Sequence, residues 1–170
     1  ILSLKDINFS NEIEETGTTF FENALIKAET IHNYLKEIGL DADVISDDSG
    51  LCCLGINLEP GIYSARYAGE HGNAKLNRDK LIKNLEDRVK EAYFICTIVL
   101  YHIDGTYEYK EGKTFGKIIN EEIGDTSFGY DCIFLSDDLG KTFGEATSEE
   151  KNKVSHRYRA LVELKDLINK

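Results

Sequence analysis

The sequence predicts a single α/β domain in which helices flank a mixed β-sheet. Segments whose apolar residues recur at helical spacing are interleaved with short apolar runs of strand length, a pattern typical of α/β proteins. The 170 residues fit one domain and can bury a sizeable core. A hydrophobic fraction of 41% favours a folded globule, and no linker or internal repeat divides the chain. We therefore expect one domain over residues 1–170.

Composition excludes several classes of protein. The formal net charge of −11 opposes non-specific attraction to nucleic acid, although a local group of bases can still hold a small phosphorylated ligand. No run is long and apolar enough to span a bilayer, and no signal peptide is visible. The four cysteines form no C-x-x-C pair, which argues against structural zinc and is consistent with reduced thiols in the cytoplasm. The chain begins at Ile1 without any methionine, so we expect its natural start to lie upstream.

The first predicted helix follows Thr19, which forms a capping-box pattern with Glu22. Gly39 is expected to end this helix. Lys27 lies beside the apolar stripe, where its ammonium either reaches a cleft or simply extends along the surface. The stripe consists of Phe21, Ala24, Leu25, Ala28, Ile31, Leu35 and Ile38.

An acidic segment follows the predicted strand 42–45. Ser46-Asp47-Asp48-Ser49-Gly50 has the composition of a turn, with Gly50 permitting a change of direction. Two carboxylates and a hydroxyl at a strand end are hard oxygen ligands that suit Mg²⁺. The alternative is a solvated turn without function. A second strand is predicted over residues 51–56.

Pro60-Gly61 predicts a further turn, after which Arg66 lies between two tyrosines. Such an arginine either clamps a phosphate or carboxylate or stacks on the neighbouring rings. Asn73 is expected to cap a helix whose remaining face is charged and solvent-exposed.

The middle of the chain predicts a hairpin. Residues 92–103 are apolar on both alternations, which favours a strand covered on both faces. Asp104-Gly105 is a strong hairpin signal, and the chain returns through residues 106–109. A polar and aromatic loop follows over residues 124–131, and residues 132–135 predict a short buried strand.

Two helical segments end the chain. Ser148 is expected to start one, and Ser155 to cap the second. His156 and Arg157 then lie in a first helical turn beside free backbone N–H groups, a place for an anion or a carbonyl oxygen. An unrelated pair of surface residues is the alternative. The expected buried stripe of this helix is Ala160, Leu161, Leu164, Leu167 and Ile168.

Five separated segments together resemble the inosine/xanthosine triphosphate pyrophosphatases, which remove non-standard purine nucleotides. The match runs in the same order from about Glu14 to the C-terminus, and this is more specific than any single motif. The segments are Glu15-Thr16-Gly17 with 19–24 and Lys27-Ala28, Ser46–Leu51, Pro60–Tyr67, Phe128-Gly129-Tyr130-Asp131, and Glu150-Lys151-Asn152 with Ser155-His156-Arg157.

The resemblance implies Mg²⁺-dependent hydrolysis of a nucleoside triphosphate to the monophosphate and pyrophosphate. It implies that Asp48 is the general base and, with Glu15, a metal ligand. Ser49 is implied to contact the substrate, and Arg66 lies in a family motif of less certain role. The other implied substrate-binding residues are Lys27 and Lys151 for the nucleotide, Phe128, Gly129, Tyr130 and Asp131 for the base and sugar, His156 and Arg157 for reading the base, and Ser155 next to that pair.

The resemblance also implies a fold and an assembly. The expected fold is an elongated mixed β-sheet with flanking helices and two lobes around a central nucleotide cleft, as a homodimer. The family's opening strand and its Ser/Thr-x-Asn-x-x-Lys loop have no counterpart in this chain, so the N-terminal strand is expected to be missing. Cys132 stands where the family commonly has proline. The rival hypotheses are a related pyrophosphatase for other modified nucleotides and a catalytically inactive nucleotide-binding homologue.

Overall fold

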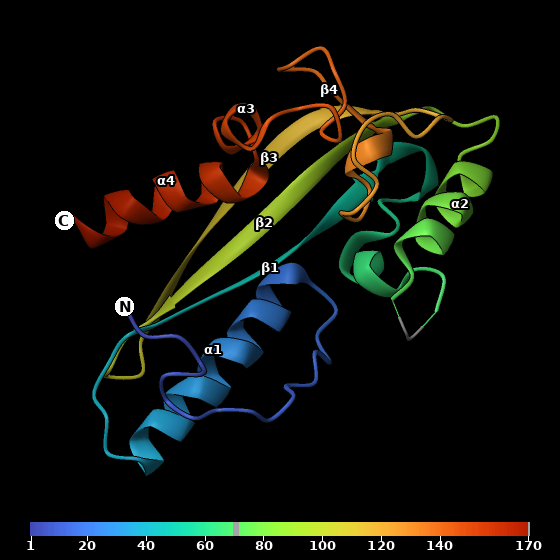
Figure 1. The fold of residues 1–170 in the computed structure, drawn as a ribbon. Coiled ribbons are helices and arrows are strands. Elements are labelled where there is room, and N and C mark those ends of the chain that lie inside the picture. Colours follow the sequence, from blue (N-terminus) through green and yellow to red (C-terminus); the bar gives the residue numbers. More distant parts are fainter. Residues whose placement is uncertain (70–71, 170) are drawn as a thin grey trace.

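The computed structural model describes residues 1–69 and 72–169, in which a four-stranded sheet lies between helices (Figure 1). The strand order is β1-β2-β3-β4, and every pairing is antiparallel. The strands are β1 (Val44–Cys53), β2 (Glu91–Tyr101), β3 (Tyr107–Ile118) and β4 (Phe134–Ser136). The helices are α1 (Phe20–Glu37), α2 (Ala74–Asn84), α3 (Ser148–Asn152) and α4 (His156–Ile168).

The predicted α/β class, with helices flanking an elongated sheet, is confirmed. The described pairings differ from the expected mixed sheet, because neighbouring strands alternate in direction across the whole described sheet. The hairpin at Asp104-Gly105 connects β2 and β3 as predicted, and β2 is buried along most of its length. None of the described helices is long and apolar enough to cross a membrane.

The turn predicted at residues 46–50 is wrong, because this segment is the middle of β1. The strand pairs continuously with β2 from Val44, opposite Tyr101, to Cys53, opposite Ala92. Gly50 serves close packing instead of a turn: a Cβ there would lie 2.4 Å from the carbonyl oxygen of Gly61. Tertiary pairing thus overrides the local preference of Asp, Ser and Gly for turns.

Two other predicted strands are displaced. The strand predicted over 51–56 is the end of β1, which is followed by a 3₁₀ turn, η1 (Leu54–Ile56). The strand predicted over 132–135 is divided between a 3₁₀ turn, η3 (Asp131–Ile133), and β4. Both shifts are a few residues long; Cys132, Ile133 and Phe134 are buried, whereas η1 has no buried residue and Leu54 is exposed.

The helix starts follow the predicted caps closely. The Thr19 side chain accepts from the backbone N–H of Glu22, but the Glu22 carboxylate accepts from Thr18 instead of Thr19, so only half of the capping box forms. Thr147, one residue before the predicted start, caps α3 in a complete capping box. Ser155 caps α4 as predicted by accepting from the N–H of Tyr158.

The helices cover opposite faces of the sheet, as Figure 1 shows for α1 and α4. Even-numbered residues of β1 face α1, and odd-numbered residues face the layer of α4. The α4 stripe is narrower than predicted: Ala160 and Leu164 are buried, whereas Leu161 and Ile168 are exposed. Gly112 of β3 lets α4 approach closely, since a Cβ there would lie 2.3 Å from a helix nitrogen.

A third cluster fills the other end of the molecule. It joins the end of β1 and the start of β2 to α2, η3 and β4, with Phe94, Phe134 and Leu81 among its buried members. A 3₁₀ segment, η2 (Gly61–Arg66), packs against β1 here. The cleft described below lies where this cluster meets the central strands.

Candidate active site

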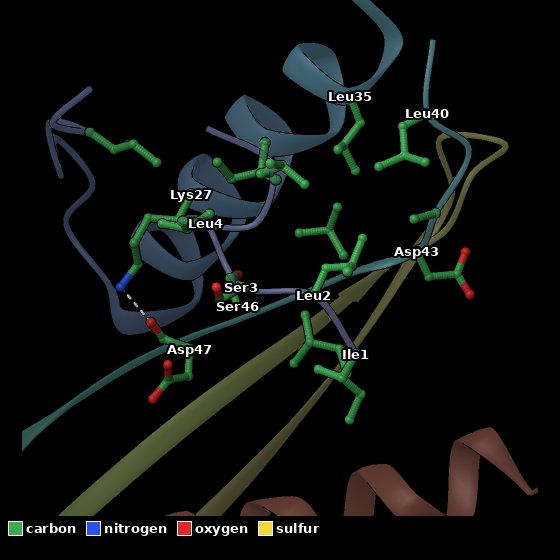
Figure 2. Close-up of a pocket in the computed structure, with 16 residues that line it drawn as sticks. Ile1, Leu2, Ser3, Leu4, Lys27, Leu35, Leu40, Asp43, Ser46 and Asp47 are labelled. Atoms are coloured by element: carbon green, nitrogen blue, oxygen red, sulfur yellow. Dashed lines mark hydrogen bonds between the residues drawn. The ribbon is translucent and has the colours of Figure 1, made fainter. Parts of the chain in front are cut away.

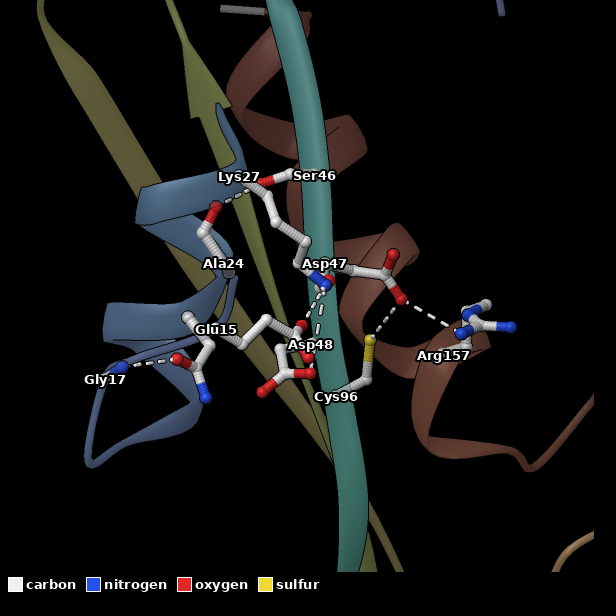
Figure 3. Close-up of polar contacts among 10 residues, drawn as sticks. Glu15, Gly17, Ala24, Lys27, Ser46, Asp47, Asp48, Cys96 and Arg157 are labelled. Atoms are coloured by element: carbon white, nitrogen blue, oxygen red, sulfur yellow. Dashed lines mark hydrogen bonds and ion pairs between the residues drawn. The ribbon is translucent and has the colours of Figure 1, made fainter. Parts of the chain in front are cut away.

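Asp48 lies at the centre of a charged group on the α1 side of the sheet (Figure 3). Lys27 projects from α1 and places its Nζ 2.9 Å from Glu15 Oε1 and 3.8 Å from Asp48 Oδ1. The same ammonium donates to the backbone carbonyl of Asp47. The segment before α1 is held to the helix by Asn23, whose Oδ1 accepts from Gly17 N at 2.8 Å. Lys27 therefore points into the charged group and is more than an extended surface lysine.

The environment of Asp48 favours its protonated form. Burial raises its pKa from 3.8 to about 6, the Lys27 ammonium opposes the rise, and the Glu15 carboxylate adds to it. The side chain is only 14% exposed, and its Oδ2 is buried without a hydrogen-bond partner among the described residues. A carboxylate with a pKa near neutrality can accept a proton from water at physiological pH.

Asp48 and Glu15 are the side chains here that fit a divalent cation. Both offer hard oxygen ligands, and the unpartnered Oδ2 of Asp48 is a ready coordination position. In the part of the chain that the structure describes, no group of three or more His, Cys, Asp or Glu side chains could hold a metal ion. Two carboxylates, with water and substrate phosphates completing the shell, is the usual arrangement for Mg²⁺.

Asp47 faces the opposite side of β1 and pairs with Arg157. The Arg157 Nη2 donates to Asp47 Oδ2 at 2.9 Å, and the Cys96 thiol lies 3.7 Å from the same oxygen. Asp48 and Arg157 thus lie on opposite faces of the sheet, a consequence of strand alternation that the predicted turn would not impose. β1 is an edge strand of the described sheet, and neither of the two cavities described below contains Asp48 or Arg157.

A cleft of about 390 Å³ opens beside the Asp47 face of β1. Ser49 lines it from β1, and Phe128 lines it from the loop before η3 with 68% of its surface exposed. Lys151 of α3 forms an ion pair with Asp131 at the cleft wall. The cleft thus combines an exposed aromatic ring, a hydroxyl and a lysine, which suits a ligand with a flat ring and a negative charge.

His156 lies behind one wall of this cleft. Its ring stacks on Phe94, with centroids 5.1 Å apart and planes at 17°, and Phe94 itself lines the cleft. Burial lowers the pKa of His156 to about 4, with the positive charges of Arg157 and Lys151 adding to the effect. The ring is therefore neutral at pH 7, and its buried Nδ1 has no hydrogen-bond partner among the described residues.

Three predicted substrate-binding residues make contacts that support the fold. Tyr130 is buried and donates its hydroxyl to the carbonyl of Ser64 at 2.6 Å, although part of it reaches the cleft. Ser155 is the N-cap of α4. Arg66 lies over the ring of Tyr63, 5.1 Å from its centroid, and does not line the cleft. Of the two interpretations of Arg66, the stacking one matches this geometry.

A separate cavity of about 560 Å³ lies between the N-terminal segment, α1 and the start of β1 (Figure 2). Its wall is mainly aliphatic, with contributions from Leu2, Leu35 and Leu40. Lys27 and Asp47 reach it only at one end, as Figure 2 shows. Apart from Lys27 at one end, the wall is mainly aliphatic, so a triphosphate would lose more hydration in this cavity than its charged contacts could replace, and the cavity does not fit a nucleotide.

Sequence reasoning misses several residues of the site. The predicted turn places Asp47 and Asp48 in one group. In the structure both belong to one continuous strand, where successive side chains point to opposite faces, so the two carboxylates are separated. Phe94 belongs to a strand recognised only as buried. The pattern of α2 places Arg78 on a solvated face, yet this residue is 3% exposed and contacts the cleft loop. No local signal marks Arg78, because its partners lie more than 40 residues away along the chain.

Comparisons with known proteins identify the family of this chain. A family model described as the Ham1 family matches residues 1–167. A dITP/XTP pyrophosphatase of Clostridium perfringens is 48% identical over 170 residues, which cover 98% of this chain and 83% of that protein. The dITP/XTP pyrophosphatase of Bacillus subtilis is 42% identical over 171 residues, with 99% and 84% covered.

Solved structures give the same result. The Ham1 protein of Staphylococcus aureus superimposes with a TM-score of 0.90 at 36% identity, covering 99% of this chain and 85% of that one. A nucleoside-triphosphatase, also titled dITP/XTP pyrophosphatase, from Mycobacterium abscessus gives 0.77 at 38% identity, with 96% and 85% covered. This chain belongs to the Ham1 family.

Proposed function

We propose that the protein hydrolyses non-standard purine nucleoside triphosphates, namely ITP, dITP and XTP, to the monophosphate and pyrophosphate. The observation that carries the proposal is the partly buried carboxylate of Asp48, which has one unpartnered oxygen and which Lys27 links to a second carboxylate, Glu15. The names of the relatives, dITP/XTP pyrophosphatases, supply the substrate class.

The residues on the α1 side are suited to the triphosphate. Glu15 and Asp48 would hold Mg²⁺, which supplies charge neutralisation at the phosphates. Lys27 is already directed at both carboxylates and would share the phosphate charge. Asp48 then accepts the proton of a water that attacks the α-phosphorus, and the bond from that phosphorus to the bridging oxygen breaks to release pyrophosphate.

The cleft on the other side of β1 is suited to the nucleoside. Phe128 is exposed and can stack on a purine, and Lys151 is free to exchange its contact with Asp131 for a ligand. Arg157 is exposed and can donate to the keto oxygen of inosine or xanthosine, whereas the buried His156 Nδ1 reaches the base only if its ring moves from behind Phe94. Adenine presents an amino group at that position. Its N–H donors would meet the N–H donors of the protein, so no hydrogen bond would form and adenine would bind less well.

A nucleotide that binds both the charged group on the α1 side and the cleft on the other side must pass around the edge of β1. Ser49 lies next to Asp48 in the chain and on the opposite face, so it marks the crossing point. The connection is short because Lys27 and Arg157 already bind the backbone and the side chain of the same residue, Asp47. We infer that the triphosphate crosses β1 near Ser49.

The proposal is tested by pyrophosphate release from ITP, XTP, GTP and ATP with Mg²⁺, using the metal-free protein as a blank. We expect turnover of ITP and XTP and a much lower kcat/KM for ATP. Equal turnover of all four would contradict the proposed base selection. Nucleotide binding without any pyrophosphate release would instead support an inactive homologue.

We also propose that the protein is a homodimer formed through β3. Side chains on the α1-facing surface of β3 remain exposed, although Tyr107 and Tyr109 also contact Phe21 of α1. An antiparallel two-fold axis at Gly112 would place Glu111 against Lys113 of a second copy, and Tyr109 against Phe115. The row of side chains on this surface of β3 is therefore complementary to the same row in a second copy, as an isologous interface requires. Its residues are Tyr107, Tyr109, Glu111, Lys113, Phe115 and Lys117.

The remaining expectations follow from the same assignment. We propose that residues 1–170 act as one nucleotide-binding domain in the cytoplasm, without a nucleic-acid or membrane partner. The free thiols of all four cysteines support a reducing compartment. The net charge of −11 supports the absence of a nucleic-acid partner.

A further inference from the structure

Arg78 is a buried arginine that ties α2 to the wall of the nucleotide cleft. Its side chain is 3% exposed, although it belongs to a helix that is otherwise largely polar. Its Nη1 donates to the carbonyl oxygen of Gly129 at 2.7 Å, and its Nε donates to Glu122 Oε1 at 3.0 Å. Both partners belong to the segment that leads from β3 to η3. One guanidinium therefore fixes two points of this segment to α2.

The contact with Gly129 restrains the backbone beside Phe128, whose own carbonyl oxygen accepts from Asp131 N at 3.1 Å. The Phe128 ring is 68% exposed, so few side-chain contacts hold it over the cleft. Its position is set by the backbone, and Gly129 adopts a left-handed conformation with φ of 42°. A glycine in this conformation is not restrained by a Cβ. The hydrogen bond from Arg78 adds a restraint at this residue, next to the ring.

The neighbouring residue of α2 holds the opposite wall. Asn77 is 4% exposed, its Oδ1 accepts from Ala68 N at 2.7 Å, and its Nδ2 donates to the carbonyl of Ala65 at 3.1 Å. Ala65 lines the same cleft as Phe128. Two consecutive buried side chains of α2 thus bind the two walls, and the helix sets the distance between them.

We propose that Arg78 is a positioning residue that holds Phe128 in place to receive the purine ring, an inference that rests on the proposed function. Arg78 touches no reacting atom. It keeps the cleft wall in its binding position before the nucleotide arrives, which lowers the cost of ordering that wall on binding.

The charges around Arg78 make it suitable for substitution. Glu122 also lies 3.2 Å from Lys75, and it is partly exposed. Removing the guanidinium therefore leaves this carboxylate with a second cation and with water. Arg78→Met retains most of the side-chain volume in the buried position, so we expect the fold to persist. Lys75→Met is the matched control, because it removes the other partner of Glu122 without touching Gly129.

The kinetic test compares these variants with ITP as substrate. We expect Arg78→Met to raise KM about tenfold through the lost charge-assisted hydrogen bond, with kcat within about twofold. Arg78→Lys should recover part of the loss, and Lys75→Met should change KM by less than about twofold. In a Phe128→Ala background, Arg78→Met should add little, because the ring that it positions is gone. Additive effects of these two substitutions would overturn the proposal.

A second test does not depend on activity. Hydrogen exchange of the nucleotide-free protein should be faster over residues 124–131 in Arg78→Met than in the wild-type protein, and unchanged in Lys75→Met. Unchanged exchange over this segment would overturn the role of Arg78 even if KM rises. If the wild-type protein releases no pyrophosphate but the exchange difference is present, the proposed function fails while the positioning contact stands.

Discussion

Neutralising Asp48 should stabilise the metal-free protein while abolishing its activity. Burial raises the pKa of this carboxyl from 3.8 to about 6. At about 1.4 kcal/mol per pKa unit, the ionised form costs about 3 kcal/mol in the folded state. The folded pKa is above the unfolded one, so the stabilising contribution is complete below pH 3.8 and is lost as the pH rises through 6. Asp48→Asn stays neutral and avoids this loss.

The assay is urea unfolding of wild-type and Asp48→Asn proteins at several pH values in the presence of a chelator. The difference in the free energy of unfolding should grow in favour of the variant by about 2.4 kcal/mol between pH 4 and pH 7. Pyrophosphate release by the variant should fall at least about 100-fold, since the proton acceptor is lost. Adding Mg²⁺ should stabilise the wild-type protein more than the variant.

Asp47→Asn is the control, because it removes a carboxylate from the other face of the same strand. This substitution breaks the partly exposed pair with Arg157 and should lower stability by less than about 1 kcal/mol. A difference between wild type and Asp48→Asn that does not change with pH would refute the reasoning, as would an active Asp48→Asn enzyme.

Three further predictions concern the other face and the sheet surface. Arg157→Ala should reduce the preference for ITP over ATP about 10- to 100-fold, measured as the ratio of kcat/KM values; an unchanged ratio would exclude Arg157 from base selection. The pKa of His156 is lowered to about 4 in the folded state. Between pH 6.5 and 4, His156 therefore binds a proton in the unfolded state but stays neutral in the folded state, which favours unfolding. His156 alone should therefore cost the folded wild-type protein up to about 3 kcal/mol on acidification from pH 6.5 to 4, opposite in sign to the Asp48 contribution. In urea unfolding, the stability of His156→Phe relative to wild type should rise by that amount over this range. Glu111→Lys and Lys113→Glu should each weaken the dimer in analytical ultracentrifugation, whereas a mixture of the two variants should form heterodimers; two unaffected homodimers would rule out the β3 interface.

Local patterns predict much of the secondary structure. Helix α1 with its Thr19 cap, the β2–β3 hairpin and the Ser155 cap of α4 all depend on residues close together in the chain. Such signals act through side-chain contacts with nearby backbone groups, so they can be recognised in the sequence without knowledge of the fold. The family is also predicted correctly, because its five segments keep their order and composition along the chain.

Other features of the site cannot be predicted from local sequence, because they depend on contacts between distant segments. The segment around Asp48 has turn composition, yet ten consecutive pairs with β2 make it a strand. This pairing separates Asp47 from Asp48 by placing them on opposite faces. Likewise, the helical pattern places Arg78 on a charged outer face. In the structure its side chain is buried, because the segment that contains Glu122 and Gly129 packs against it.

The sequence by itself determined the class of fold, the family, and the chemical types of the residues that the site requires. Only the tertiary structure decided how those residues are arranged: which carboxylate of the Asp47-Asp48 pair meets Lys27 and which meets Arg157, and which buried arginine holds the cleft wall. The reason is that composition and spacing act within a few residues, whereas burial, pKa and the facing of a side chain depend on strand pairing and helix packing between distant segments.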